Sequence, residues 1–342
     1  LGGAGLIVTT SGASAACTNT SGTVYVCSSD ETTTQSLNGG GSLLDVTIVD
    51  SATSFDTSGT AGDAFDLYSR AGITFTNNNS EVTITGKAIG IEADNRNSGA
   101  LSITTTGDTT GGASYHGIKA TNAGTSLTID AATTTGGESG IFAWNKGSGT
   151  LSITANTTGG VNFGIEAKTT GTGALSITTT GITTSGQFDG IYAINSSASE
   201  GDLTIDAVTT MGGDDGIEAD NNGTGALSIT TTGTTTGETR DGINANNSAA
   251  STGDLTIKAA TTTGATDGID ARNYGEGALS ITTTGDTESG NGSVGIRAYN
   301  KSTGTDLTIN AATTTGGVHG IYAINNGTGE LSITTNTTGG IG

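Results

Sequence analysis

The 342-residue sequence contains no proline, and only 4% of its residues are aromatic and 13% charged. It does contain 59 glycines, but without proline these argue against both collagen and a polyproline linker. A chain with so few large apolar residues can look disordered. A fixed apolar period argues against disorder here, because a thin core stacked layer upon layer needs few apolar residues in each layer.

Basic residues are also scarce. The chain has 11 Lys and Arg against 32 Asp and Glu, which gives a formal net charge of -21. Such a charge repels nucleic acid and anionic headgroups, so neither is expected as a partner. No run is long enough to span a bilayer as a helix.

Cysteine is limited to Cys17 and Cys27. A disulfide between them would close a small loop and imply an oxidising compartment, and a pair of free thiols is the alternative. The spacing fits no zinc motif, and two ligands are too few. We favour the disulfide, because the sequence before it also has secretory features.

Residues 1–15 resemble the tail of a secretory signal, with an apolar run and then Ala13-Ser14-Ala15 as a cleavage site. An ordinary first strand is the alternative. We expect residues 16–70 to form an amino-terminal cap with irregular first coils, and residues 71–342 to form regular repeats. Residues 336–340 copy residues 156–160, which lead into another coil, so we expect the repeat array to be truncated.

One motif organises the chain, Gly-Ile-x-Ala-x-Asn. Its copies are spaced 23 to 27 residues apart, a period typical of repeat architectures. Ala follows each Ile by two positions, and Asn follows by four in every copy except the one with Thr169. The copies begin at Ile91, Ile118, Ile141, Ile165, Ile191, Ile217, Ile243, Ile269, Ile296 and Ile321.

Each unit also contains Leu-Ser/Thr-Ile and a Thr-rich stretch, separated by Gly- and Asn-rich turns. All three segments alternate with period two and are rich in β-branched residues. The sequence therefore predicts an all-β fold, a right-handed single-stranded parallel β-helix of about 11 or more coils with three short strands per coil of ~25 residues. The missing proline fits, since inner strands cannot spare an amide.

Stacked coils place equivalent positions ~4.8 Å apart, so the sequence can be read as columns. A column of side-chain amides can bond along the axis, because each amide both donates and accepts. We predict a structural ladder of Asn95, Asn122, Asn145, Asn195, Asn221, Asn247, Asn273, Asn300 and Asn325.

A second column is acidic: Asp189, Asp215, Asp241 and Asp267 each precede Gly-Ile. Stacked carboxylates repel one another, which raises pKa values or recruits a cation. We expect a solvated acidic edge with side chains pointing outward, and a weak calcium site is the alternative. Comparison with the paired carboxylates of β-helical polysaccharide hydrolases fails on order and spacing. No catalytic residue, enzymatic activity or firmly bound cofactor is expected.

Outward positions of the Gly-Ile strands carry aromatic rings, which can stack on sugars or anchor a protein partner. These candidates for surface contact are Phe142, Trp144, Tyr192, Tyr299 and Tyr322.

Together, the Ala-Cys-Thr-Asn-Thr…Val-Tyr-Val-Cys-Ser-Ser start at 16–29 and the repeated coils resemble the passenger domains of Gram-negative autotransporters. The resemblance implies a secreted or cell-surface adhesive β-helix and a carboxy-terminal outer-membrane β-barrel outside this chain. It also implies a partner on a host or neighbouring cell, either protein or glycan, or self-association. A carbohydrate-binding or carbohydrate-cleaving β-helix is the alternative. An ice-binding solenoid is third, because charges interrupt its Thr-rich strands.

Overall fold

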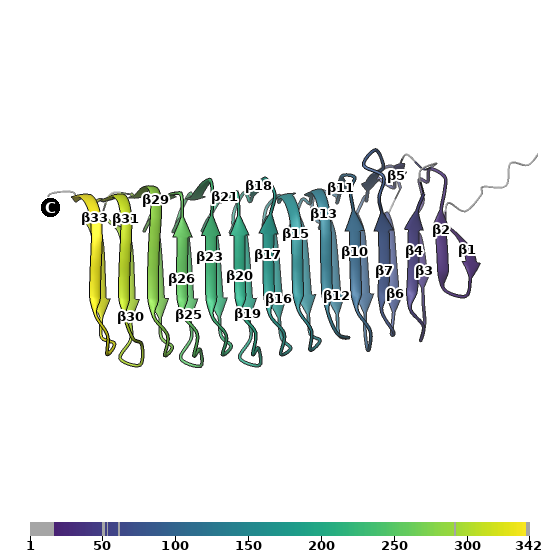
Figure 1. The fold of residues 1–342 in the computed structure, drawn as a ribbon. Helices are drawn as coiled ribbons and strands as arrows, with labels where there is room; N and C mark the ends of the chain where they lie inside the picture. Colours follow the sequence, from purple (N-terminus) through teal and green to yellow (C-terminus); the bar gives the residue numbers. More distant parts are fainter. Residues whose placement is uncertain (1–16, 50–51, 53, 61, 291, 340–342) are drawn as a thin grey trace, which may run out of the picture.

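The computed structural model describes residues 17–49, 52, 54–60, 62–290 and 292–339. They form an elongated parallel β-solenoid of about 11 turns, with about 26 residues in each turn (Figure 1). This confirms the predicted fold class. The predicted signal remnant at residues 1–15 lies outside the described residues. The described residues contain no helix long and apolar enough to cross a membrane.

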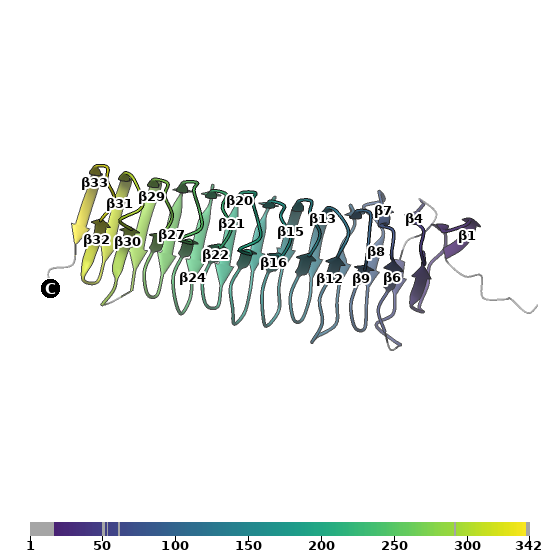
Figure 2. The same cartoon turned by 90° about the horizontal axis from the view of Figure 1, so that it is seen from below.

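Three rows of strands run along the rod, as the two views show (Figure 1 and Figure 2). The first row is a 12-stranded sheet made of the Ile-x-Ala-x-Asn segments. Its strands are β3 (Gln35–Asn38), β6 (Phe65–Ser69), β9 (Ile91–Asn95), β12 (Ile118–Asn122), β14 (Ile141–Asn145), β16 (Ile165–Thr169), β19 (Ile191–Asn195), β22 (Ile217–Asn221), β25 (Ile243–Asn247), β28 (Ile269–Asn273), β30 (Val294–Asn300) and β32 (His319–Asn325).

The second row contains the Leu-x-Ile segments, and in five coils its strand continues into the Thr-rich segment. Its strands are β4 (Leu44–Ile48), β7 (Ile73–Asn77), β10 (Leu101–Thr105), β13 (Leu127–Thr135), β15 (Leu151–Thr158), β17 (Leu175–Thr179), β20 (Leu203–Ala207), β23 (Leu227–Thr231), β26 (Leu255–Ala259), β29 (Leu279–Ser289), β31 (Leu307–Gly316) and β33 (Leu331–Gly339). The third row holds the separate Thr-rich strands β5 (Ser54–Asp56), β8 (Thr83–Thr85), β11 (Thr109–Thr110), β18 (Ile182–Thr184), β21 (Thr209–Gly212), β24 (Thr234–Gly237) and β27 (Thr261–Gly264).

Strands in neighbouring coils pair in parallel and in register. Ile217 of β22 lies beside Ile243 of β25, and Asn221 lies beside Asn247. The inward Ile, Ala and Leu side chains are fully or almost fully buried in one continuous core as far as Ala311, whereas Leu331 and Ile333 of the last described coil are exposed. Because successive side chains of a strand point to opposite faces, the residues that alternate with these inward ones face outward.

The glycine before each Ile is required by close packing. A Cβ on Gly216 would lie 2.5 Å from the carbonyl oxygen of Gly242 and 2.8 Å from a methyl of Thr235, an inward residue of the third row. Gly216 does not have a positive φ, so glycine is required here because a side chain would not fit, and a left-handed backbone is not the reason.

The amino-terminal end differs from the rest. The strands β1 (Cys17–Ser21) and β2 (Val24–Cys27) form an antiparallel hairpin, and β2 then pairs in parallel with β4. A disulfide joins Cys17 to Cys27. Inside the first coils, the ring of Phe65 packs against those of Phe55 and Phe75, with centroid distances of 4.8 and 4.9 Å and with the rings tilted in the first pair and edge-to-face in the second. These aromatic rings occupy positions that Ile and Thr hold in the regular coils.

Candidate functional site

The predicted asparagine column is a hydrogen-bonded ladder. Nδ2 of Asn221 donates to Oδ1 of Asn247 at 2.8 Å, and the same bond joins Asn95 to Asn122 at 2.7 Å. Nδ2 of Asn221 also donates to the carbonyl of Gly225, and Oδ1 accepts the N–H of Gly223. Each fully buried amide thus has partners in its own turn and in the adjacent coils, which is the condition for burying a polar group without penalty.

Thr169, the exception in this column, loses the hydrogen bond to one neighbouring coil and keeps the bond to the other. Its Oγ1 donates to Oδ1 of Asn195 at 3.1 Å. Nδ2 of Asn145, on the other side, donates to the carbonyl of Gly149. The Thr hydroxyl therefore keeps the link to one neighbouring coil.

The acidic column is the place where the sequence-based expectation is wrong. Asp189, Asp215, Asp241 and Asp267 are buried, with at most 5% of each residue exposed, and do not form a solvated edge. Oδ1 of Asp215 accepts the backbone N–H of Asp241 at 2.7 Å, and Oδ1 of Asp189 accepts that of Asp215 at 3.0 Å. Oδ1 of Asp267 accepts the N–H of Val294. Each carboxylate therefore bonds to the backbone of the following coil.

Burial changes the acid–base properties of this aspartate ladder. Desolvation raises the pKa of Asp189 to about 8, and those of Asp215 and Asp241 to about 6. Arginines reach two of the other oxygens: Nη1 of Arg240 lies 3.3 Å from Oδ2 of Asp215, and Nε of Arg297 lies 2.6 Å from Oδ2 of Asp267. A proton on Asp189 and these two guanidinium groups limit the charge inside the ladder.

One part of the ladder could hold a cation. Oxygen atoms of Asp189, Asp215 and Glu218 all lie within 4.8 Å of one another. Burial raises the pKa of Glu218 as well, and nearby Asp220 adds to the effect. Calcium takes six to eight oxygen ligands, and Oδ1 of both aspartates already accepts an amide, so three carboxylates are a thin donor set. Asp241 and Asp267 do not join this group.

Sequence reasoning missed Glu218, which belongs to this region, and Asp63, which lies in the same column several coils earlier. Glu218 points outward from β22, beside Tyr192 of β19. Because the two strands are paired, a carboxylate oxygen of Glu218 lies within 4.8 Å of one of Asp189. Asp63 accepts the N–H of Ile89, in the coil that follows it, at 2.8 Å. Each ladder aspartate makes the same type of bond to its own following coil. The available signal was Asp63-Ala64-Phe65, a divergent Asp-Gly-Ile, since Phe65 pairs with Ile91.

His116 and His319 occupy the same column as the aspartates. The carbonyl of His116 accepts the N–H of Gly90, as that of Asp215 accepts the N–H of Gly190. His319 pairs with Val294 and is exposed.

The five outward aromatic residues fall into three clusters on the 12-stranded sheet. Phe142 and Trp144 line one groove, of about 450 Å³. Tyr192 stacks on Phe163, which in turn stacks on Phe188, with ring centroids 5.1 and 5.5 Å apart. The third cluster lines a groove of about 300 Å³ and contains Tyr274, Tyr299 and Tyr322. The candidates therefore do not form one contiguous patch.

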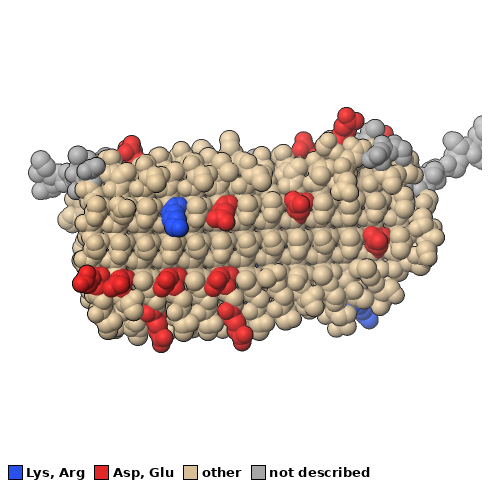
Figure 3. Space-filling view, viewed as in Figure 1, with Lys and Arg blue, Asp and Glu red and all other residues tan. Residues whose placement is uncertain are grey.

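Basic residues gather on the same side. Eight of the 11 Lys and Arg residues lie on this sheet, four within its strands and four directly after them. They are Lys119, Lys168, Arg272 and Arg297, followed by Arg70, Arg96, Lys146 and Lys301. In contrast, the side seen in Figure 3 is mostly uncharged, and the charged side chains on it are almost all acidic.

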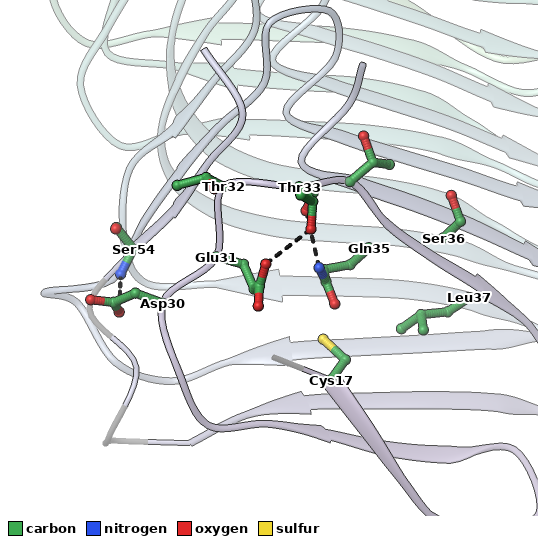
Figure 4. A pocket seen from close by; sticks show the side chains of 10 residues that line it. Cys17, Asp30, Glu31, Thr32, Thr33, Gln35, Ser36, Leu37 and Ser54 are labelled. Atoms are coloured by element: carbon green, nitrogen blue, oxygen red, sulfur yellow. Dashed lines mark hydrogen bonds between the residues drawn. The ribbon is translucent and has the colours of Figure 1, made fainter. Parts of the chain in front are cut away.

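A larger hollow of about 700 Å³ lies at the amino-terminal end, between Cys17 and the segment from Asp30 to Leu37 (Figure 4). Its polar groups bond to one another. Thr33 Oγ1 donates to Glu31 at 2.9 Å, and Gln35 Nε2 donates to the carbonyl of Thr33 at 3.0 Å. Nothing in this lining gathers catalytic or ligand-binding groups, so we place the candidate site on the 12-stranded sheet.

No protein-family model matches the chain, and neither a curated protein nor a solved structure shows significant similarity to it. The class of the molecule is therefore defined by its own architecture, a parallel β-solenoid with an asparagine ladder.

Proposed function

We propose that this solenoid is a secreted or surface-displayed adhesive rod, the passenger of an autotransporter-like protein on the exterior of a Gram-negative cell. The observation that carries the proposal is the contrast between the two faces of the 12-stranded sheet. Inward positions repeat Ile, Ala and Asn with little change, whereas outward positions vary among acidic, basic and aromatic residues. A constant scaffold with a variable outer surface suits recognition of a partner.

The partner of such a surface is a protein or glycan of a host or neighbouring cell, or a second copy of the rod. Aromatic rings beside charged side chains suit these partners, since they combine apolar contact with polar specificity. With a net charge of -21 the rod would not bind nucleic acid. No catalytic step is part of the proposal.

Beads coated with the full chain test the adhesive function. We expect them to aggregate or to adhere to cell surfaces more than beads coated with a variant in which Trp144, Tyr299 and Tyr322 are replaced by Ala. These rings lie outside the core, so the variant should keep its melting temperature. Equal adhesion by the two proteins would contradict the proposal.

The carbohydrate-cleaving alternative predicts a different result. A polysaccharide-cleavage assay with the full chain would detect products, and Asp215→Asn would abolish them. Such a result would replace the adhesive proposal with an enzymatic one. Binding to a glycan array without cleavage would support the adhesive proposal.

Ice binding remains the third candidate because of one specific observation. The first outward position of the Leu-x-Ile strands is Ser or Thr in every coil from Thr74 to Ser332, on a side that is mostly uncharged (Figure 3). The second outward position is interrupted by Asp130, Asp206 and Lys258. Thermal hysteresis of the purified chain would favour this candidate over adhesion.

A further inference from the structure

Four groups define what we call the basic groove: Arg96, Lys119, Trp144 and Lys146, which lie on or next to β9, β12 and β14. Together with Phe142 and Asp94 they line the hollow of about 450 Å³. Lys119 lies beside Phe142 in the paired strands, and Thr121 lies beside Trp144. Thr121 and Ala123, which also line the groove, both have small side chains.

Lys146 holds the unbalanced charge of this groove. Arg96 binds Asp94 at 2.6 Å, and Lys119 binds Glu92 at 2.7 Å. In the described part of the chain Lys146 has no ion pair, and its Nζ lies 3.9 Å from the centre of the Trp144 ring. The groove therefore carries a net positive charge on a chain whose total charge is -21. Such a local exception favours an anionic ligand.

The ion pairs of the groove are exchangeable. The side chains of Asp94 and Glu92 keep 28% and 29% of their surface exposed, and exposed ion pairs contribute little stability. A ligand carboxylate could therefore replace either partner at small cost. The indole is held in place, because Nε1 of Trp144 donates to Oγ1 of Thr170 at 3.2 Å.

We propose that the basic groove binds an acidic saccharide. A sugar ring displaces Lys146 from the face of the Trp144 indole and stacks there, and Lys146 and Arg96 bind its carboxylate groups. This inference rests on the proposed adhesive function and names the class of ligand for one of its surfaces. An aromatic ring alone would accept a neutral sugar equally well. The positive charge selects the acidic one.

The third aromatic cluster provides a matched comparison on the same sheet. Its groove contains Arg272 and Arg297, but these arginines bind the buried carboxylates of Asp270 and Asp267 at 2.5 and 2.6 Å. Releasing either arginine would leave a buried charge without its partner, which is costly. This groove is therefore not expected to select acidic saccharides.

Trp144 is the single tryptophan of the chain, so its fluorescence reports on the groove directly. We would titrate the full chain with oligogalacturonate and with a neutral oligosaccharide of equal length. Only the acidic ligand should give a saturating change, and added salt should weaken binding. An equal response to both ligands, or no saturation at millimolar concentration, would overturn the proposal.

Two variants complete the test. Lys146→Ala should raise the Kd for oligogalacturonate about tenfold, the effect of losing one hydrogen bond to a charged group. Tyr299→Ala in the other groove should leave it unchanged. An unchanged Kd for Lys146→Ala would contradict the assignment. Loss of saccharide binding in a Lys146→Ala variant whose beads still adhere would separate the two claims, because the adhesive function would stand without this groove.

Discussion

The asparagine ladder and the aspartate ladder lie at opposite ends of the same strands. Both bury polar side chains, but the two kinds of side chain find their hydrogen-bond partners differently. An amide donates and accepts, so each Asn bonds to its counterpart in the next coil, and the ladder continues from Asn95 to Asn325 with one interruption. A carboxylate only accepts, so each Asp bonds to a backbone N–H of the following coil and must also lose or balance its charge.

The largest effect should come from placing a carboxylate in the neutral ladder. Asn221→Asp would lose the bonds donated to Asn247 and Gly225 and would bury a charge, so we expect a loss of about 3–5 kcal/mol. Denaturant unfolding measures this change, and Asn222→Asp at the adjacent exposed position is the control. Equal stability of the two variants would show that the ladder tolerates charge.

The aspartate ladder should make the protein less stable as the pH rises. Folding raises the pKa of Asp189 to about 8 and of Asp215 and Asp241 to about 6, so the folded state binds more protons than the unfolded state above pH 4. The stability is fully present below the unfolded value of 3.8 and is lost as the pH rises through 6 to 8. Each pKa unit corresponds to about 1.4 kcal/mol.

The melting temperature should therefore be higher at pH 5 than at pH 9. A melting temperature that rises over this interval would show that the ladder aspartates are ionised without penalty in the folded state.

Replacing Asp189 by Asn tests the same cause at one position. The side-chain oxygen can still accept the N–H of Asp215, but the charge is gone, so Asp189→Asn should stabilise the protein by roughly 3–5 kcal/mol more at pH 9 than at pH 5. Urea unfolding at both pH values measures the difference. Destabilisation at pH 9 that depends on added calcium would instead assign a cation to Asp189, Asp215 and Glu218.

The smallest effect is expected at the far end of the neutral ladder. Asn325 is only half-buried, whereas Asn221 is fully buried. Asn325→Ala should cost about 0.5–1 kcal/mol, and Asn221→Ala about 2–3 kcal/mol, because water can replace the lost partners only at the exposed position. Hydrogen exchange of the amides in β32 and β22 would resolve the two local effects. Equal losses would mean that burial does not set the strength of the ladder.

Much of the fold could be predicted because the repeat period itself defines the columns. Once Ile217 pairs with Ile243, the position of every Asn in the ladder follows. The burial of Asp215 could not be predicted in this way. The repeat period places Asp215 in a column. Whether its side chain is buried depends on how closely the neighbouring glycines pack around that turn.

The candidate site was predicted less completely than the fold. The outward aromatic residues were found from period two alone, but their division into three clusters depends on partners such as Phe163, which lies in a turn. The importance of Lys146 rests on its lack of an ion pair in the described structure, and only the pairing of Asp94 with Arg96 and of Glu92 with Lys119 reveals it.

In-register pairing also bears on how the molecule can change in length. Because every regular coil offers its neighbour the same Ile, Ala and Asn positions, removal of two whole coils, such as residues 191–242, would bring Gly190 to Ile243 and restore the Gly-Ile junction. The shortened chain would keep its core and lose ~10 Å of reach, at ~4.8 Å per coil. Recombination between repeats can therefore tune how far the rod extends without redesigning its interior.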